Sequence, residues 1–142
     1  MKDLYEYVNI SNVPLENRIK LSIEETRELL KRIDINRACA TYSRHVFSYL
    51  SQNHVVSKIV NTKDLGAEYE HYFVIAPINT YEYYLIDLTY PQFNNKELFK
   101  NLYEKGYERI TDLNFYLYYQ IVTNEQSKIT IQDVFLNKGR SR

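Results

Sequence analysis

Three residues in the middle of the chain have side chains that could together perform nucleophilic chemistry. The single cysteine, Cys39, is followed by His71 and then by Asp87. A cysteine thiolate attacks acyl carbons, a histidine can take up the proton of the thiol, and a carboxylate can fix the tautomer and orientation of that histidine. We therefore predict a catalytic triad in which Cys39 is the nucleophile, His71 the general base and Asp87 the residue that orients the base.

His71 and Asp87 belong to a predicted β-hairpin. Its two strands, residues 71–76 and 83–89, are rich in β-branched and aromatic residues and are bounded by prolines. Side chains alternate between the faces of a strand, so the length of the loop decides whether the histidine and the aspartate share a face. A three-residue loop at 78–80 would place His71 directly opposite Asp87, whereas a two-residue loop would put the aspartate on the other face. We predict the three-residue loop, because a buried carboxylate needs a partner.

Cys39 is predicted to lie in the first turn of a helix that runs to about residue 52. Asp34 or Asn36 can cap this helix. The unpaired amides and the positive end of the helix dipole would stabilise a thiolate at this position. The same position would also suit an inert core cysteine, because free cysteine is among the most buried residue types. The inward stripe of the helix reads Cys39, Ser43, Val46 and Leu50.

This order, a cysteine at a helix start followed by a histidine and an aspartate on adjacent strands, resembles the papain-like and transglutaminase-like superfamily of Cys-His-Asp enzymes. The segment 84–90, Tyr-Leu-Ile-Asp-Leu-Thr-Tyr, is similar to the transglutaminase-like pattern of an apolar strand that ends in Asp-Pro-Thr, with Leu88 where proline is common. The resemblance covers residues 36–93. It implies an α+β fold in which N-terminal helices, with the cysteine at a helix N-terminus, pack on a small antiparallel sheet that is followed by C-terminal helices.

The resemblance also implies the chemistry, which is acyl chemistry on an amide or thioester, such as proteolysis, glutamine deamidation or transamidation, or acyl transfer. A protein substrate is expected because the hairpin at 70–93 has no Gly-rich or basic pocket for a nucleotide or coenzyme A phosphate. Neither a cofactor nor a metal is expected. The oxyanion would be held by the backbone amide of Cys39 and a second donor, for which Asn36 and Gln92 are the candidates. Papain-like enzymes use an upstream glutamine, and Asn36 stands at a different spacing. A small domain of this type is most similar to a bacterial effector or toxin deamidase.

Length and composition restrict the other classes of function. The 142 residues predict one domain, 1–142. Lys and Arg together number 18, as do Asp and Glu, so nucleic acid is not an expected partner. One cysteine fits a reducing compartment, residues 1–20 lack the apolar core of a signal peptide, and no apolar run approaches the roughly 20 residues of a membrane helix. We expect a soluble protein, without a membrane partner, that is cytoplasmic or exported without a Sec-type signal.

The remaining elements frame the predicted triad. Residues 1–21 are weakly patterned and are expected to form an N-terminal arm, after which the capping box at 22–25 opens a helix. The inward stripe of that helix is predicted to be Ile23, Leu29, Leu30 and Ile33. An edge strand is predicted at 54–61. Three further helices are predicted at 96–105, 113–123 and 131–136, the first of them ended by Gly106.

Two alternatives to the triad remain open from the sequence. One is a zinc site formed by Cys39, His71, Asp87 and a fourth ligand, although the short ligand spacings of zinc motifs are missing. The other is a non-catalytic interaction domain of the same fold. It would use the tyrosine-rich helix at 113–122 as a binding face, or to form a homo- or hetero-oligomer, because that helix is apolar nearly all round.

Overall fold

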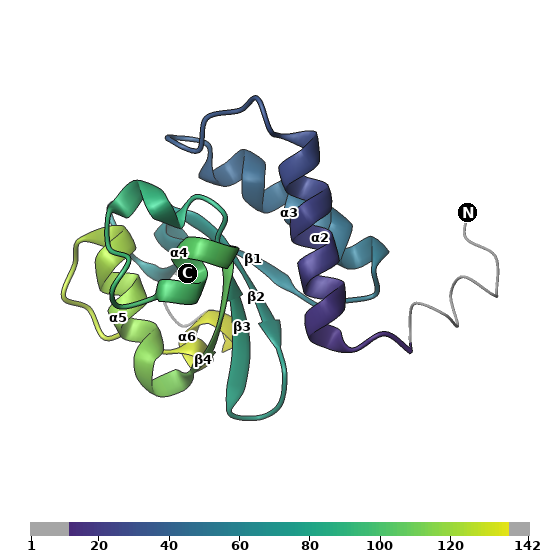
Figure 1. The fold of residues 1–142 in the computed structure, drawn as a ribbon. Helices are drawn as coiled ribbons and strands as arrows, with labels where there is room; N and C mark the ends of the chain where they lie inside the picture. The colour runs from purple at the N-terminus through teal and green to yellow at the C-terminus, as the bar shows by residue number, and fades with distance from the viewer. Residues whose placement is uncertain (1–11, 137–142) are drawn as a thin grey trace.

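The structure, a computed structural model, describes residues 12–136 and has an α+β fold (Figure 1). The described helices are α2 (Leu15–Leu29), α3 (Cys39–Gln52), α4 (Lys100–Lys105), α5 (Asp112–Thr123) and α6 (Ile131–Leu136), with two 3-10 turns, η1 (Thr62–Leu65) and η2 (Tyr90–Phe93). The strands are β1 (Lys58–Asn61), β2 (Tyr72–Pro77), β3 (Glu82–Ile86) and β4 (Tyr107–Thr111), which form an antiparallel sheet in that order. The predicted α+β class with an antiparallel sheet is confirmed. None of the described helices is both long and apolar enough to cross a membrane.

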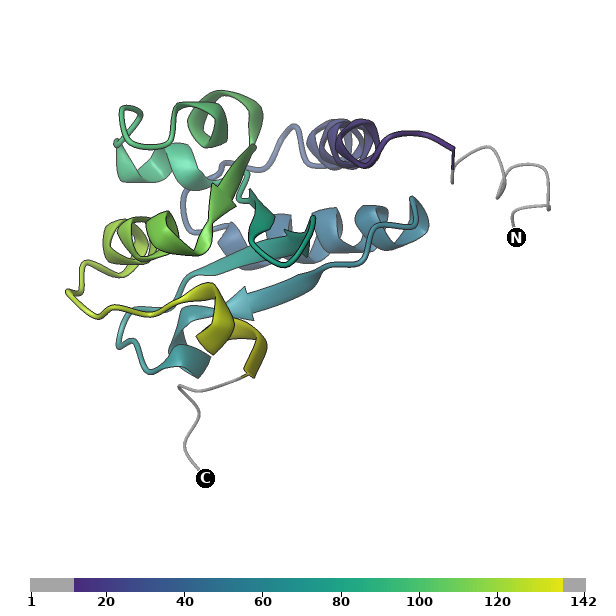
Figure 2. The ribbon, with the colours of Figure 1, turned by 90° about the horizontal axis from the view of Figure 1, so that it is seen from below.

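The sheet is covered by helices on both faces. Alternate residues of β2 and β3 enter two separate cores: Val74 and Ile86 pack with α2 and α3, whereas Phe73 and Leu85 pack with α4, α5 and α6. Figures 1 and 2 show α2 and α3 on one side of the sheet and α5 on the other. Because both faces are buried, the two strands read as continuous apolar runs and not as an alternation of apolar and polar residues.

The β2–β3 hairpin has an odd-length loop, as predicted, but its register differs from the prediction. The amide of Ile78 donates to the carbonyl of Glu82, which leaves Asn79, Thr80 and Tyr81 in the loop. The predicted loop at 78–80 is therefore wrong by one residue. The cause is Asn79, whose side-chain oxygen accepts from the amides of Tyr81 and Glu82 and closes the turn one residue later.

This shift moves the pairing by two residues and keeps the faces unchanged. Pro77 pairs with Tyr83 and Val74 with Ile86. When this register is continued beyond the strands, Thr89 lies opposite His71. The predicted direct pairing of His71 with Asp87 is therefore wrong. The two side chains are diagonal neighbours on one face, which is still within reach of longer side chains.

Helix α2 begins earlier than predicted. It starts at Leu15, after Pro14, so the predicted capping box at 22–25 is wrong and residues 15–21 are helical. The hydroxyl of Ser22 donates to the carbonyl of Arg18, which is the bond of a serine inside a helix and not of a cap. The rest of the predicted arm, residues 1–11, lies outside the described residues.

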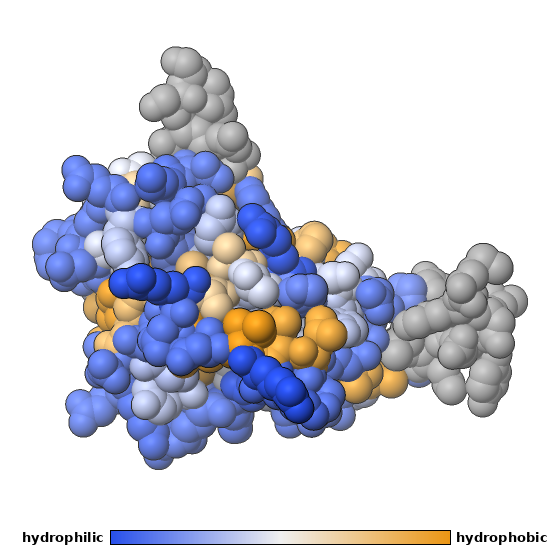
Figure 3. Space-filling model, turned by 90° about the horizontal axis from the view of Figure 1, so that it is seen from above, coloured by the Kyte–Doolittle hydropathy of each residue, from blue (hydrophilic) through white to orange (hydrophobic). Residues whose placement is uncertain are grey.

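The predicted inward stripe of α2 is also partly wrong. Ile23 and Leu30 are buried as predicted, and so is Ile19, but Leu29 and Ile33 are 53% and 46% exposed. Figure 3 views the molecule from the side of the α2–α3 connection and shows apolar residues gathered at the surface of that face. The chain leaves the helix at Leu30, so the residues beyond it no longer follow the helical period.

Strand β4 is not among the elements predicted from the sequence, and α4 is shorter than predicted. The helix predicted at 96–105 begins only at Lys100, although it ends as predicted at Gly106, whose φ of 87° is the left-handed conformation that favours glycine. The chain then forms β4 beside β3, where Arg109 binds the carboxylate of Glu82 with two hydrogen bonds. The edge strand predicted at 54–61 corresponds to β1, which is shorter than predicted and lies at the edge of the sheet. The helices predicted at 113–123 and 131–136 are confirmed as α5 and α6.

Candidate active site

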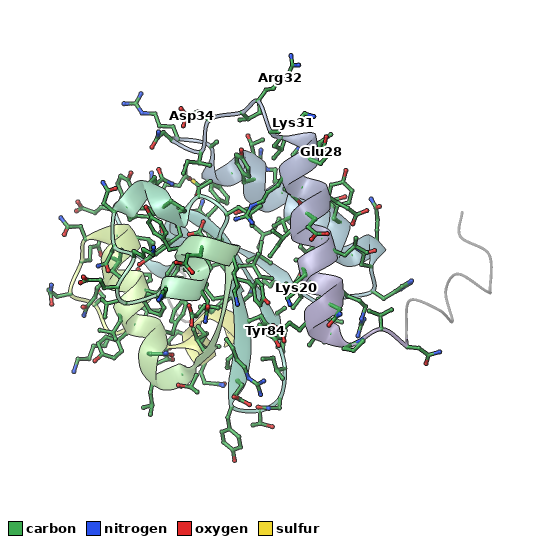
Figure 4. All side chains as sticks on the ribbon, in the orientation of Figure 1. Lys20, Glu28, Lys31, Arg32, Asp34 and Tyr84 are labelled. Atoms are coloured by element: carbon green, nitrogen blue, oxygen red, sulfur yellow. The ribbon has the colours of Figure 1, made fainter. Side chains whose placement is uncertain are left out.

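Cys39 is the first residue of α3, which confirms its predicted place in the first turn. The predicted caps are wrong, because the N-cap position is Ala38 and no side chain caps the helix. Asp34, labelled in Figure 4, instead accepts hydrogen bonds from the backbone and side-chain amides of Asn36 within the α2–α3 connection. The first amides of a helix have no partner inside the helix, so the half-buried Cys39 lies at an electropositive end.

The inward stripe of α3 differs from the prediction at one place. Tyr42, Ser43, Val46 and Leu50 are buried, while Cys39 is only half-buried. The hydroxyl of Tyr42 donates to the carbonyls of Leu30 and Ile33 and fixes the connection that leads to the cysteine. Cys39 is therefore held, half-buried, at the margin of the core.

His71 lies directly before β2 and is 1% exposed. Its backbone is fixed on both sides by Thr62, whose hydroxyl accepts the amide of His71 and whose amide donates to its carbonyl. The ring of Phe93 packs edge-on against the imidazole, with centroids 4.9 Å apart. Nε2 of His71 lies 2.7 Å from Oδ2 of Asp87, which leaves Nδ1 as the ring nitrogen for a second partner.

Asp87 follows β3 directly and uses both carboxylate oxygens. Oδ1 accepts from the backbone amide and the hydroxyl of Thr89, at 3.1 and 3.0 Å. Oδ2 accepts from His71 and from the hydroxyl of Tyr118, each at 2.7 Å. A buried carboxylate is tolerated when it is hydrogen-bonded in this way. Asp87 therefore holds the imidazole in one orientation, while Tyr118 and Thr89 hold Asp87.

The sequence analysis did not identify Tyr118 or Thr89 as part of the site. Thr89 carried a signal, because a short polar side chain two residues after an aspartate often bonds its carboxylate in a tight turn. Tyr118 was assigned only to an apolar helix. A buried tyrosine hydroxyl needs a partner, but the sequence does not show that α5 crosses the end of the hairpin that carries Asp87.

The pKa shifts of Cys39 and His71 favour a charged thiolate beside a charged imidazole. Burial raises the pKa of Cys39, but hydrogen bonds to His71 and to the backbone of Tyr72, together with the charge of His71, lower it below the ordinary value. Burial alone would lower the pKa of His71, but the charge and hydrogen bond of Asp87, and then Cys39, raise it to about 9. Both shifts favour transfer of the thiol proton to the imidazole near neutral pH.

The two predicted oxyanion donors have different surroundings. The side-chain amide of Asn36 is bonded to Asp34. Gln92 lies in η2, half-buried, and its backbone amide donates to the carbonyl of Thr89. Neither contact tests a role in catalysis, so both assignments stay predictions.

Residues 12–136 contain no set of ligands for the alternative zinc site. Across this part of the chain, no three side chains of the His, Cys, Asp and Glu types are arranged to hold a metal ion. The oxygens of Asp87 are occupied by four donors, and Nε2 of His71 is one of those donors. Nε2 of His71 and Oδ2 of Asp87 are therefore bonded to each other, which leaves neither of these two atoms for a shared metal ion.

Removal of the Tyr118 hydroxyl measures how much its hydrogen bond to Asp87 contributes to the stability of the protein. We expect Tyr118→Phe to lower the free energy of unfolding by about 2 kcal/mol, because a buried hydrogen bond to a charged group is lost. Urea denaturation measures the change. Tyr81→Phe is the control, since Tyr81 is 76% exposed and its variant should stay within about 0.5 kcal/mol of the parent. Equal losses in the two variants would contradict the assignment.

Comparisons with known proteins return no relative. No protein-family model matches the chain, and no curated protein or solved structure matches it. The papain-like and transglutaminase-like resemblance therefore rests on the residues of this chain alone.

Proposed function

We propose that the protein is a cysteine-nucleophile enzyme that performs acyl chemistry on a protein substrate through Cys39, His71 and Asp87. The observation that carries the proposal is the buried bond, 2.7 Å long, between Nε2 of His71 and Oδ2 of Asp87, beside the Cys39 thiol whose pKa the same imidazole lowers. Each residue has the surroundings that its role requires. Cys39 lies half-buried at the start of a helix, His71 is oriented by Asp87, and Asp87 is fixed by Thr89 and Tyr118.

The first half of the proposed reaction forms an acyl-enzyme. His71 holds the proton of Cys39, and the thiolate attacks the carbonyl carbon of the substrate amide. The backbone amide of Cys39 and a second donor, Asn36 or Gln92, stabilise the resulting oxyanion. The tetrahedral intermediate collapses when His71 returns the proton to the leaving nitrogen. The products of this half are a thioester on Cys39 and a free amine or ammonia.

In the second half, His71 acts as the base. It takes a proton from water or from a primary amine, and that nucleophile attacks the thioester carbonyl. Collapse of this intermediate breaks the carbon–sulfur bond, releases the acid or the new amide, and leaves the proton on the imidazole beside a regenerated thiolate. Asp87 keeps the imidazole in place through both halves, because its contacts with Thr89 and Tyr118 do not involve the substrate.

We infer a papain-like or transglutaminase-like arrangement from how the site is built. The cysteine helix α3 packs against the sheet, and the histidine and the aspartate flank the adjacent central strands β2 and β3. These positions support the arrangement that the superfamily resemblance implied for residues 36–93. The Asp87-Leu88-Thr89 turn favours glutamine deamidation or transamidation over proteolysis, and the small size of the domain is compatible with a bacterial effector or toxin.

The interaction-domain alternative stays a prediction that no observation favours. Helix α5 buries Phe115, Tyr118, Tyr119 and Val122 against the core, and its most exposed apolar residue is Leu113, at 84%. Packing within the chain therefore accounts for most of the apolar surface of this helix.

The substrate and the reaction can be identified by mass spectrometry of a treated proteome. We expect the protein, incubated with bacterial and eukaryotic cell lysates, to convert specific glutamines to glutamates or to primary-amine adducts. New chain termini would instead indicate proteolysis. The control is Cys39→Ser under the same conditions. A set of modifications that is identical with and without Cys39 would contradict the proposed function.

A further inference from the structure

A groove of about 650 Å³ opens beside Phe93, whose ring packs against the imidazole of His71. Its lining comes from three places: the segment after η1, η2 itself, and the C-terminal end of α5. Phe93 forms the wall between groove and triad, since its ring lines the groove and also packs edge-on against the imidazole of His71. In Figure 2 the segment after η1 lies beside the segment that follows α5. The backbone amide of Glu68, in the first segment, donates a hydrogen bond to the side chain of Glu125, in the second.

The groove is negatively charged. Its lining includes two carboxylates, Glu68 and Glu125, and no lysine, arginine or histidine. Neither carboxylate forms an ion pair with any residue that the structure describes. The backbone amide of Glu68 donates to Glu125 at 2.8 Å, which holds the two acidic residues side by side. The C-terminal end of α5 adds the negative end of a 12-residue helix dipole to the same groove.

The walls of the groove are apolar and partly aromatic. Phe93, Ile121 and Val122 supply the inner surface, and the ring of Tyr69, 56% exposed, stands at the rim. Lysine and arginine combine an apolar stem with a charged head, and the head is attracted to carboxylates and to the faces of aromatic rings. An apolar groove with an acidic rim fits such a side chain better than it fits an acidic or a purely apolar one.

We propose that this groove binds a lysine or arginine side chain of the polypeptide substrate, close in sequence to the residue whose acyl group Cys39 attacks. The proposal rests on the proposed function, because it requires a substrate that Cys39 attacks. It adds the substrate class: a protein segment with a basic residue beside the reacting one. Phe93 would contact both parts of the bound segment, since it lies between the groove and His71.

Peptidyl chloromethyl ketones test the charge preference without knowledge of the natural substrate. The Cys39 thiolate displaces chloride from the reagent and forms a carbon–sulfur bond, and intact-protein mass spectrometry follows the rate. Three probes carry lysine, norleucine or glutamate next to the reactive residue and are otherwise identical. We expect the lysine probe to react about tenfold faster than the norleucine probe, and the glutamate probe to react slowest.

The double variant Glu68→Gln/Glu125→Gln should bring the lysine-to-norleucine ratio close to one. Glutamine at 125 can still accept the amide of Glu68, so the groove keeps its shape. Glu97→Gln is the matched control, because Glu97 is exposed, lies outside the groove and should leave the ratio unchanged. Iodoacetamide has no side chain for the groove and is used to normalise the rate of each protein.

The outcomes separate this inference from the proposed function. Fast reaction with iodoacetamide but equal rates for the three probes would overturn the inference and leave the proposed function in place. The fastest reaction with norleucine would mean that the groove takes an apolar side chain, and would also overturn the inference. Slow reaction with every reagent until the protein unfolds would overturn both.

Discussion

Replacement of Cys39 by serine is expected to abolish the acyl chemistry while the fold remains almost unchanged. A serine hydroxyl holds its proton far more strongly than a thiol, so no anionic nucleophile forms beside His71 near neutral pH and the thiolate of the proposed reaction is lost. We expect kcat to fall about 10⁴-fold or more, as when the nucleophile of other triads is removed. Cys39 is half-buried and serine is close to it in shape, so the free energy of unfolding should change by less than about 1 kcal/mol.

Turnover of the substrate found by mass spectrometry, together with thermal denaturation, measures both effects. Ser48→Ala is a matched control on the exposed face of α3 and should retain activity and stability. A Cys39→Ser protein that unfolds easily but keeps its activity would show that Cys39 is a core residue and not the nucleophile.

Replacement of Asp87 by asparagine is expected to reduce both rate and stability. All four groups around the carboxylate donate to it in the structure. The amide nitrogen of an asparagine would face Thr89 in one orientation, and His71 and Tyr118 in the other. In the second orientation the amide favours the wrong tautomer of His71, and kcat should fall about 10⁴-fold.

The loss of stability follows from the same contacts. An unpaired buried donor costs about 1–3 kcal/mol, so we expect a decrease of this size in the free energy of unfolding. Denaturation by urea and steady-state kinetics on one preparation measure the two effects. Asp64→Asn in η1 is the control, since this residue is exposed and should tolerate the change. An Asp87→Asn protein with normal kcat would contradict the orienting role of Asp87.

The sequence was sufficient to predict that His71 and Asp87 share a face, because the parity of a hairpin loop decides this. It was not sufficient for the register. The loop closes where Asn79 accepts two backbone amides, and a shift of one residue in the loop moves every pair by two. The contact between histidine and aspartate survives this error, because diagonal neighbours with long side chains still meet.

Other errors have a common cause, which is that tertiary packing overrides local patterns. Ser22 and Glu25 form a convincing capping box in sequence, yet the chain before them is already helical from Leu15. Strand β4 was missed because charged residues interrupt its apolar pattern. One of them, Arg109, pairs with Glu82 on the neighbouring strand, and this partner is distant in sequence. The role of Tyr118 depends likewise on how α5 crosses the hairpin.

Alkylation of Cys39 in the folded protein across pH tests the central claim most directly. An ordinary cysteine, with a pKa of about 8.5, has only about 1% of its thiols ionised at pH 6.5. The hydrogen bond and charge of His71 lower the pKa of Cys39, so its rate of reaction with iodoacetamide should rise at a lower pH than that of an ordinary cysteine. His71→Asn removes both effects, and its reaction profile should move to higher pH.

The account predicts an apparent pKa below that of an ordinary thiol in the parent protein and a higher one in the His71→Asn variant. The same reaction in urea gives the reference value for the unfolded chain. A cysteine that reacts only when the protein unfolds, or a profile that His71→Asn leaves unchanged, would contradict the claim that Cys39 and His71 form a catalytic pair.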